Sequence, residues 1–544
     1  MEILAIVVSL SAFFWTAKQL KAVLFWLYLW QLKDYHLSRF IAHFSTVKGR
    51  QIFASKAFLL KIFLAAAFFA ATAFKFLSWW SLALLGLYAA EALKALAALA
   101  LNKAKKPVWT RKAIMLSVFS FGLALYFLYS FFLIHHSSFI FLQWLLILDI
   151  LMPVFVSGVI LILQPITVFF RNRIIAKAKA KRSRFKDLIV VGITGSCGKS
   201  SAKEFLAVIL SQKYKVARTP KNQNSEMGIS RTILNLLKPE HQIFVCEMGG
   251  YNIQGIELLT KIAKPQIGVL TQINQQHLAT FGSQENIVKA KFKLIESLPE
   301  NGAAILNIDN EFIKKEASCR KFKVKKIKKY SVKEEADVWA ENIAIKKDKV
   351  SFEVFSRDGE FAKFEIGLPG GKPIVSNLLS SIAAAKELKM SLAEIQKACQ
   401  KIDASFAPIA VKQSPKGLNI IDSSYSANPE GVLADLDYLN LWVGKKIVVM
   451  PSLIELGSAV KQVHKDIGKK IGEVCDLAII TSRDGLREIK AGALKKGLNP
   501  DKIIYSEDPQ KIVEIIKKET QRGDTVLLEG RVPEGVLKIL AKIK

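Results

Sequence analysis

The 544-residue sequence predicts an α-helical transmembrane domain followed by two α/β domains, first a doubly wound parallel sheet with a phosphate-binding loop and then a Rossmann-like domain. Long apolar runs are confined to the first 170 residues, and short β-branched runs alternate with helical stretches beyond them. Up to Lys186 there are 23 Lys or Arg against 4 acidic residues, whereas the remaining 358 residues hold 55 against 42. A basic, apolar segment before a more balanced one indicates a membrane domain joined to a soluble part.

Five apolar stretches approach or exceed the roughly 20 residues that a spanning helix needs. They are residues 3–30, 58–74, 77–101, 114–134 and 139–170. Lys18 and Lys21 interrupt the first stretch, so it is alternatively an amphipathic helix on the membrane surface, which leaves four spans.

Three further charged residues, Glu91, Lys94 and Asp149, lie inside the apolar runs. Charges within a membrane are functional candidates, although Glu91 and Lys94 are three residues apart and alternatively form a simple pair.

The loops between the apolar stretches differ in charge. Segments 31–57, 102–113 and 171–186 are basic, whereas the connections near Lys75 and at residues 135–138 are nearly uncharged. The positive-inside rule places the basic loops and the C-terminal domains in the cytoplasm. We therefore expect a multi-pass protein of the cell (inner) membrane, with the lipid bilayer as a partner.

Cysteine spacing and charge exclude other classes. The five cysteines are widely spaced without a CxxC pair, which argues against a disulfide framework and a zinc ribbon. The formal net charge of +32 suits a nucleic-acid binder, but the basic residues lie between apolar runs and not along one stripe. No nucleic-acid partner is expected.

A glycine-rich turn follows the first β-branched run of the soluble part. Residues 188–193 predict a buried parallel strand, and residues 202–210 predict a helix. Backbone N–H groups of such a turn surround a phosphate, while Lys199 would reach the β- and γ-phosphates and Ser200 would hold Mg²⁺. A general phosphate loop has glycine where Ile193 stands, so a chance glycine-rich turn remains the alternative at this point.

Further strand patterns divide the soluble part in two. In the first part, strands are expected at 243–247, 266–271 and 303–308, and a small meander at 337–367. In the second part, an α/β pattern starts near 419 and continues at 446–450, 477–481 and 526–528. The join near residues 404–408 is the expected hinge, and two domains about a hinge place a nucleotide in a closing cleft. The expected domains are a transmembrane domain 1–170, a basic cytoplasmic linker 171–187, an ATP-binding domain 188–404 and a C-terminal domain 405–544.

Seven ordered motifs in residues 188–544 resemble those of the Mur ligase family. They are TGSCGKSSAKE at 194–204, TPKNQN at 219–224 with Gly228, EMGG at 247–250, the segment 265–291 with His-Leu, Phe-Gly-Ser and Ala-Lys, Asn377 at the start of NLLSS, DSSYSANP at 422–429, and IELG at 454–457 with His464. The two α/β domains would then be the Mur ligase central and C-terminal domains.

The resemblance implies an ATP-dependent amide ligase. A substrate carboxylate would take the γ-phosphoryl group to give an acyl phosphate, and an amine would then displace phosphate, which needs positioning and charge neutralisation more than a covalent nucleophile. The motifs at 422–429 and 454–457 resemble those of the member that adds D-alanyl-D-alanine to a muramoyl-tripeptide in peptidoglycan synthesis. Its cofactors would be ATP and Mg²⁺, and its partners a muramoyl-peptide or other carboxylate acceptor and an amino-acid or dipeptide amine.

Residue roles follow from the resemblance position by position. The candidate catalytic residues are Lys199 on the phosphates, His277 as a metal ligand and Lys291 as a carbamylated lysine that orients a metal. The candidate metal ligands are Ser200, Glu247, His277 and, if carbamylated, Lys291. The candidate cofactor-binding residues are Thr194, Gly195, Ser196, Cys197, Gly198, Lys199, Ser200 and Ser201 for the phosphates, Asn377 for adenine and Ser423 for the ribose. Alternatively, His277 packs structurally and Lys291 is a solvated helix lysine.

Three positions depart from the family pattern. Residues 371–374 lack a histidine and an asparagine, residues 407–409 lack the hinge arginine that would clamp the γ-phosphate, and Ser423 replaces an aspartate. An arginine at such a position can speed phosphoryl transfer by several orders of magnitude. Either another basic residue, such as the nearby Lys412, substitutes for it, or turnover is slow, or activity is lost.

The N-terminal side departs most, because nothing there resembles the soluble uridine-binding domain of the family. We therefore expect an acceptor presented at the membrane surface, as a lipid-linked precursor, with the basic linker near anionic headgroups. Two alternatives remain: a related membrane-bound ligase for another acceptor, such as a polyglutamate or a lipid-linked peptide, and a nucleotide-binding scaffold that has lost catalysis.

Overall fold

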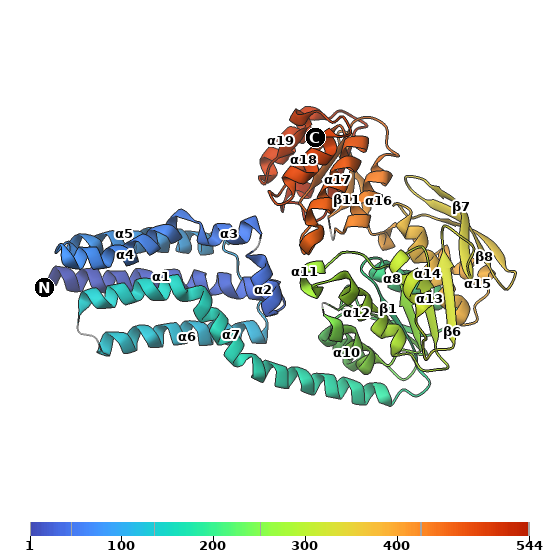
Figure 1. Ribbon diagram of the computed structural model, residues 1–544, viewed down its shortest axis with the longest axis horizontal. Coiled ribbons are helices and arrows are strands. Elements are labelled where there is room, and N and C mark those ends of the chain that lie inside the picture. The colour runs from blue at the N-terminus through green and yellow to red at the C-terminus, as the bar shows by residue number, and fades with distance from the viewer. Residues whose placement is uncertain (1, 45, 135–136, 251, 425–426, 542–544) are drawn as a thin grey trace. The chain divides into compact units, whose positions relative to one another are not determined.

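The computed structural model describes residues 2–44, 46–134, 137–250, 252–424 and 427–541. The chain divides between Asn172 and Arg173 into a helical unit and an α/β unit (Figure 1). Of the sequence expectations, the loop at His135 and His136 and the middle of the motif at 422–429 lie outside the described residues.

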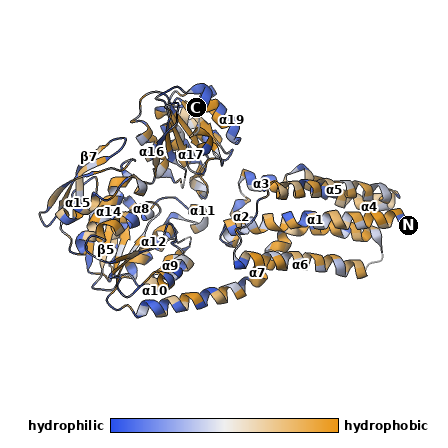
Figure 2. Cartoon of the chain, turned by 180° about the vertical axis from the view of Figure 1, so that it is seen from behind, coloured by the Kyte–Doolittle hydropathy of each residue, from blue (hydrophilic) through white to orange (hydrophobic). Residues whose placement is uncertain are grey.

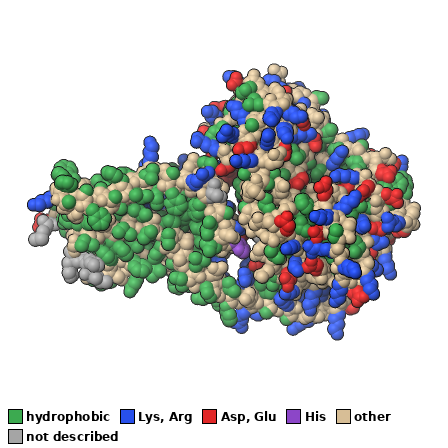
Figure 3. Space-filling view, in the orientation of Figure 1, with side chains coloured by type: hydrophobic (Ala, Val, Ile, Leu, Met, Phe, Trp, Pro, Cys, Tyr) green, Lys and Arg blue, Asp and Glu red, His purple; other side chains and the backbone are tan. Residues whose placement is uncertain are grey.

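The helical unit contains five helices that are long and apolar enough to cross a membrane. Its helices are α1 (Glu2–Leu32), α2 (Leu37–His43), α3 (Val47–Phe53), α4 (Lys56–Ala73), α5 (Leu77–Ala100), α6 (Arg111–Ile134) and α7 (Ser138–Ser183). The five stretches expected to be helical are confirmed as helices, and α1 is part of the bundle core, where Trp15, Leu27 and Trp30 are fully buried. Hydrophobic residues make up most of the helices of this unit (Figure 2), and hydrophobic side chains cover its visible outer surface (Figure 3), the distribution expected where lipid replaces water.

A cluster of four charged side chains, here the charge quartet, lies inside the bundle. Lys18 of α1 and Lys61 of α4 each pair with both Glu91 of α5 and Asp149 of α7, with Nζ–O distances of 2.8 Å for Lys18–Glu91 and 2.9 Å for each contact of Lys61. Gln19 also donates to Asp149 at 3.0 Å. The quartet is neutral in sum, so the lysines that interrupt the apolar runs are compensated by acids on other helices. Glu91 therefore pairs across the bundle rather than with Lys94.

The middle domain of the α/β unit is built on a nine-stranded sheet in the order β2-β3-β1-β4-β5-β6-β7-β8-β9. Strands β2 to β7 of this order run parallel, and β7, β8 and β9 form an antiparallel meander. The strands are β1 (Ile189–Thr194), β2 (Val216–Arg218), β3 (Ile243–Glu247), β4 (Ile267–Leu270), β5 (Ala303–Asn307), β6 (Lys326–Ser331), β7 (Val338–Ile345), β8 (Val350–Ser356) and β9 (Phe361–Ile366). The expected doubly wound sheet and meander are confirmed. Strands β2 and β6 were not expected, because one has three residues and the other is rich in lysine.

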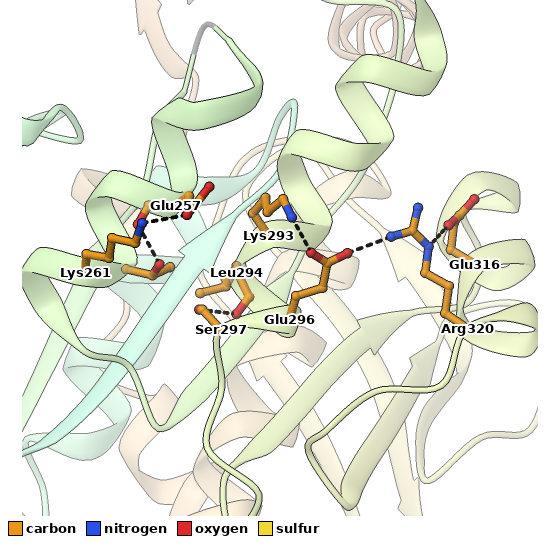
Figure 4. Close-up of polar contacts among 9 residues, drawn as sticks. Glu257, Lys261, Lys293, Leu294, Glu296, Ser297, Glu316 and Arg320 are labelled. Carbon is orange, nitrogen blue, oxygen red and sulfur yellow. Dashed lines mark hydrogen bonds and ion pairs between the residues drawn. The ribbon is translucent and has the colours of Figure 1, made fainter.

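Helices cover both faces of this sheet. On one face pack α8 (Lys199–Leu210), α14 (Pro373–Glu387) and α15 (Leu392–Cys399); on the other pack α9 (Glu226–Asn235), α10 (Ile253–Ala263), α12 (Gln284–Glu296) and α13 (Glu311–Cys319). Ion pairs on the outer side of the second layer link α12 to α13: Glu296 lies 2.7 Å from both Lys293 and Arg320 (Figure 4). The exposed side of α12 is thus charged and its other side is packed on the sheet.

The end of α7 packs on the middle domain. The Arg182 side chain is 4% exposed and donates to the backbone oxygens of Ala263 (2.9 Å), Phe185 (2.8 Å) and Leu188 (3.2 Å). Ile175 and Ala178 join the core of the second helix layer. The stretch expected to be a linker is therefore helical as far as Ser183 and is held to the middle domain by its arginine.

The C-terminal domain has a six-stranded sheet in the order β10-β11-β15-β12-β13-β14, parallel except for the edge strand β10. Its strands are β10 (Ala410–Gln413), β11 (Asn419–Ser423), β12 (Lys446–Met450), β13 (Leu477–Ile480), β14 (Ile503–Tyr505) and β15 (Thr525–Glu529). Helices α16 (Pro429–Leu439), α17 (Val460–Val474) and α18 (Leu486–Leu494) pack on one face, and α19 (Pro509–Glu519) and α20 (Val536–Leu540) on the other. The second α/β domain is thereby confirmed.

A buried acid pair lies at the carboxyl ends of β11 and β15. The Glu529 side chain is almost fully buried, and Ser423 donates to Asp435 at 2.5 Å. Burial, and then the charge of Asp435, raises the pKa of Glu529 well above its usual range; burial also raises the pKa of Asp435. The folded protein therefore holds a proton at this pair that the unfolded chain releases.

We expect Glu529→Gln to stabilise the protein at neutral pH. Because the pKa of Glu529 is raised on folding, the wild type loses stability as pH rises above about 4.5, whereas glutamine keeps the neutral form. The gain should be present at pH 7–8 and should vanish near pH 4. Thermal unfolding of the two proteins in detergent across this pH range measures it. A difference in stability between the two proteins that does not change with pH would contradict a proton held between Glu529 and Asp435.

Candidate active site

The glycine-rich turn joins β1 to α8 at the carboxyl edge of the middle sheet. Thr194 ends β1, residues 195–198 form the turn, and Lys199 begins the helix with Gly198 at φ +79°. The Lys199 ammonium donates to the backbone oxygens of Gly195 (2.8 Å) and Ser196 (2.9 Å), so it lies folded over the turn. The predicted strand, loop and helix are confirmed, and the eight residues expected to hold phosphate are contiguous in this one element.

A carboxylate from the neighbouring strand faces the first turn of α8. Glu247 ends β3, is 1% exposed, and both its oxygens lie 3.0 Å from the Ser200 hydroxyl. Asn224 donates to it at 2.8 Å, and the fully buried Lys203 lies 3.3 Å from it. Lys203 was not among the predicted site residues, although it lies within the motif at 194–204.

Three basic groups beside the turn influence one another's pKa. Burial, and then the charge of Lys199, lowers the pKa of Lys291 to about 7. Burial also lowers the pKa of His277. Glu455 acts in the opposite direction, and the charges of Lys291 and Lys199 lower this pKa further. The structure therefore brings the three candidate catalytic residues into one electrostatic environment. It also shows that Lys291 is buried, at 3% exposure, on the side of α12 opposite Lys293, so it is not a solvated helix lysine.

The remaining expected nucleotide contacts divide between the domains. Asn377 on α14 lies directly against the turn, since a Cβ built on Gly198 would overlap its side-chain amide oxygen. Ser423 is buried and its hydroxyl is engaged by Asp435 within the C-terminal domain. Lys412 pairs with Asp422 at 3.5 Å.

Hard oxygen ligands suit a Mg²⁺ ion here. Ser200 and Glu247 offer a hydroxyl and a carboxylate at one point, and Mg²⁺ binds through one or two such groups, water and substrate phosphates. Among the described residues no group of three or more His, Cys, Asp and Glu converges as a metal site. The donor set thus fits an ion that nucleotide phosphates help to bind.

Two residues after β4, Thr271 and Gln272, contact the turn but were not among the predicted site residues. The Thr271 hydroxyl donates to the Cys197 backbone oxygen at 2.6 Å, and the Gln272 backbone oxygen accepts from the Ser196 N–H at 2.6 Å. Threonine and glutamine after a buried strand carry no recognisable spacing, so the sequence offered no signal for this contact.

A phosphate-type turn beside a buried carboxylate, followed by a second α/β domain, defines a two-domain nucleotide-binding enzyme. Two family models match the chain, the Mur ligase middle domain at residues 193–385 and the Mur ligase glutamate ligase domain at residues 409–532, together more than half of it. The chain belongs to the Mur ligase family and is an ATP-dependent ligase that forms a carbon–nitrogen bond.

Curated relatives are similar over the same region. A UDP-N-acetylmuramoyl-tripeptide–D-alanyl-D-alanine ligase of Bacillus subtilis (strain 168) is 26% identical over 345 residues, which is 63% of this chain and 72% of the relative. The ligase of the same name from Synechocystis sp. is 29% identical over 66% of this chain and 76% of the relative.

Solved structures agree with the fold. MurF ligase from Thermotoga maritima in complex with ADP superimposes with a TM-score of 0.60 at 27% identity, covering 68% of this chain and 83% of that one. MurF from Acinetobacter baumannii gives a TM-score of 0.61 at 24% identity over 68% and 80% of the two chains.

We expect Gly198→Ala to weaken ADP binding at least about tenfold, because its left-handed backbone is strained for alanine and the new methyl group meets Asn377. Gly359→Ala is the matched control, with φ +85° and no atom within 4 Å of the added Cβ. Titration calorimetry with ADP compares the two. Equal ADP affinity of both variants would show that the turn does not contact the nucleotide.

Proposed function

We propose that the chain is a membrane-embedded Mur ligase that adds D-alanyl-D-alanine to a muramoyl-tripeptide precursor of peptidoglycan. The relatives of that name support the substrates. The observation that carries the proposal is the site itself: the phosphate turn and the Ser200–Glu247 pair lie at one edge of the sheet, with three electrostatically coupled basic groups beside them.

The residues fit the two chemical steps of such a ligase. The turn and Lys199 bind the ATP phosphates. In the first step the acceptor carboxylate displaces ADP from the γ-phosphorus and becomes an acyl phosphate. In the second step the amine attacks the carbonyl carbon, phosphate leaves, and the amine loses a proton. Ser200 and Glu247 would hold Mg²⁺, which neutralises phosphate charge when bound. Asn377, beside the turn, would contact adenine.

The pKa of Lys291 fits the carbamylation proposed for it. A primary amine adds CO₂ only when it is neutral, giving a carbamate and releasing one proton. With its pKa lowered to about 7 by burial, a large fraction of Lys291 is neutral at physiological pH. A carbamate there would place a negative charge among the basic groups and, like a carboxylate, would orient a metal ion.

A second candidate acceptor is a lipid-linked peptide. It is favoured by the helical unit, which precedes the matched domains in the same chain and has the surface of a membrane protein. A ligase held in the bilayer meets a membrane-linked acceptor in two dimensions, whereas a nucleotide-linked acceptor diffuses freely.

We propose that the helical unit spans the membrane with the α/β unit in the cytoplasm. The five apolar helices support this, as does the charge quartet, because compensated charges are the form in which ionisable side chains occur inside a membrane.

The function is tested by phosphate release from ATP and Mg²⁺ by the detergent-purified protein. Release with UDP-muramoyl-tripeptide should require D-alanyl-D-alanine and should fall at least about 100-fold in Lys199→Ala, since that residue holds phosphate charge. Mass spectrometry of the amide product completes the assay. No phosphate release with the UDP-linked acceptor, together with turnover of its lipid-linked form, would favour the second acceptor. ADP binding without formation of either product would identify a scaffold.

The membrane assignment predicts that the protein stays in carbonate-washed membranes and that Lys61→Met reduces its folded amount there. Removing one lysine leaves a buried acid uncompensated, at a cost of about 3–5 kcal/mol, and Lys61→Met with Glu91→Gln should recover most of it. Lys94→Met, on the exposed side of α5, is the control. Extraction of the wild type by carbonate would contradict the spans. An equal loss of folded protein in Lys61→Met and in Lys94→Met would contradict the quartet.

A further inference from the structure

The segment after β4, residues 271–277 and here the β4 loop, contacts the phosphate turn on one side. The backbone N–H of Asn274 donates to the Ser196 hydroxyl at 3.1 Å. The backbone oxygen of Gln272 accepts from the Ser196 N–H at 2.6 Å, and its side-chain oxygen accepts from the Cys197 thiol at 3.0 Å. These contacts fix the turn's backbone, so a shift of the β4 loop moves the groups that would hold phosphate.

Two carboxylates of the C-terminal domain contact the same loop on its other side. Glu430, in the first turn of α16, accepts from the Asn274 side chain. Glu455, between β12 and the 3₁₀ turn η2 (Gly457–Ala459), lies 2.6 Å from His277 Nδ1 through its Oε2. Its backbone oxygen also accepts from the N–H of Ala279 at 3.1 Å.

The backbone at the second contact is strained in both domains. His277 has φ +67° and Glu455 φ +64°, in the left-handed region that costs a residue other than glycine about 1–3 kcal/mol. Such conformations persist only where the surroundings over-determine them. Two strained residues whose side chains meet, one from each domain, indicate that the contact is built for position.

We propose that Glu455 and Glu430 are positioning residues: through the β4 loop, Glu455 sets the ring of His277 and Glu430 sets the phosphate turn. The proposal rests on the proposed function for the role of His277 as a metal ligand. A carboxylate that holds one ring nitrogen of a histidine orients the other nitrogen toward a metal, and losing such a partner typically costs 10–100-fold in metal affinity. Glu430 acts through Asn274 on Ser196, and therefore on phosphate.

The experiment uses the full-length protein in detergent. Mn²⁺ affinity in the presence of ADP is measured by electron paramagnetic resonance, and ADP affinity without metal by calorimetry. Glu455→Ala should bind Mn²⁺ about 10–100-fold more weakly, and Glu455→Gln should recover part of the loss because its amide oxygen still accepts from the ring. Glu430→Ala should weaken metal-free ADP binding. Glu473→Ala, whose carboxylate pairs with Lys496 inside the same domain, should change neither.

Hydrogen exchange of the apo protein gives a readout that needs no ligand. The amides of Ser196 and Asn274 should exchange faster in Glu430→Ala than in Glu473→Ala, with unchanged exchange in the core of β1. Unaltered Mn²⁺ affinity in Glu455→Ala, or unaltered exchange and ADP affinity in Glu430→Ala, would overturn the inference. A wild type that binds ADP and Mn²⁺ but forms no amide would count against the proposed function and leave the positioning roles standing.

Discussion

The hydrogen-bonded contact between the β4 loop and the phosphate turn is the constraint on which the site depends. Parallel strands bring the ends of β1, β3 and β4 to one edge of the sheet, and this adjacency lets Thr271 and Gln272 hold the turn by its backbone. The turn itself has glycine at the positions where a side chain would collide with Thr271 and Asn377. Its shape is therefore fixed from outside, by strands that are remote in sequence.

Both units bury charge, and each compensates it differently. In the bundle, the acids of α5 and α7 neutralise the lysines of α1 and α4, so these two helices depend on α5 and α7 for a place in an apolar environment. In the middle domain, Glu247 offsets Lys203, whereas Lys291 has no comparable acid among the causes of its lowered pKa. The first arrangement is neutral and suits a structural role, and the second is unbalanced and suits a ligand or a modification.

How much the sequence could predict depends on how far apart in the sequence the interacting residues lie. The phosphate turn was predictable because Gly, Lys and Ser occur together between a strand and a helix, and the apolar helices were predictable from length. Lys18 instead counted against its span, because its partner Asp149 is 131 residues away in the sequence. Glu430 escaped for the same reason, and Glu455 lay in the motif at 454–457 without a predicted role, since an acid of the C-terminal domain gives no sign in the sequence that it contacts the middle domain. Burial of Lys291 on the inner side of α12 also needed the fold.

The three basic groups beside the turn explain why the site needs its nucleotide. Burial is the main cause of the lowered pKa values of Lys291 and His277. Lys199 lowers both further, and Lys291 adds to the effect on His277, so each positive charge there raises the cost of the next. Glu247 and Glu455 offset part of this charge but are held by Ser200 and His277. A polyphosphate would remove the remaining repulsion, which makes binding of ATP and assembly of the basic groups mutually favourable.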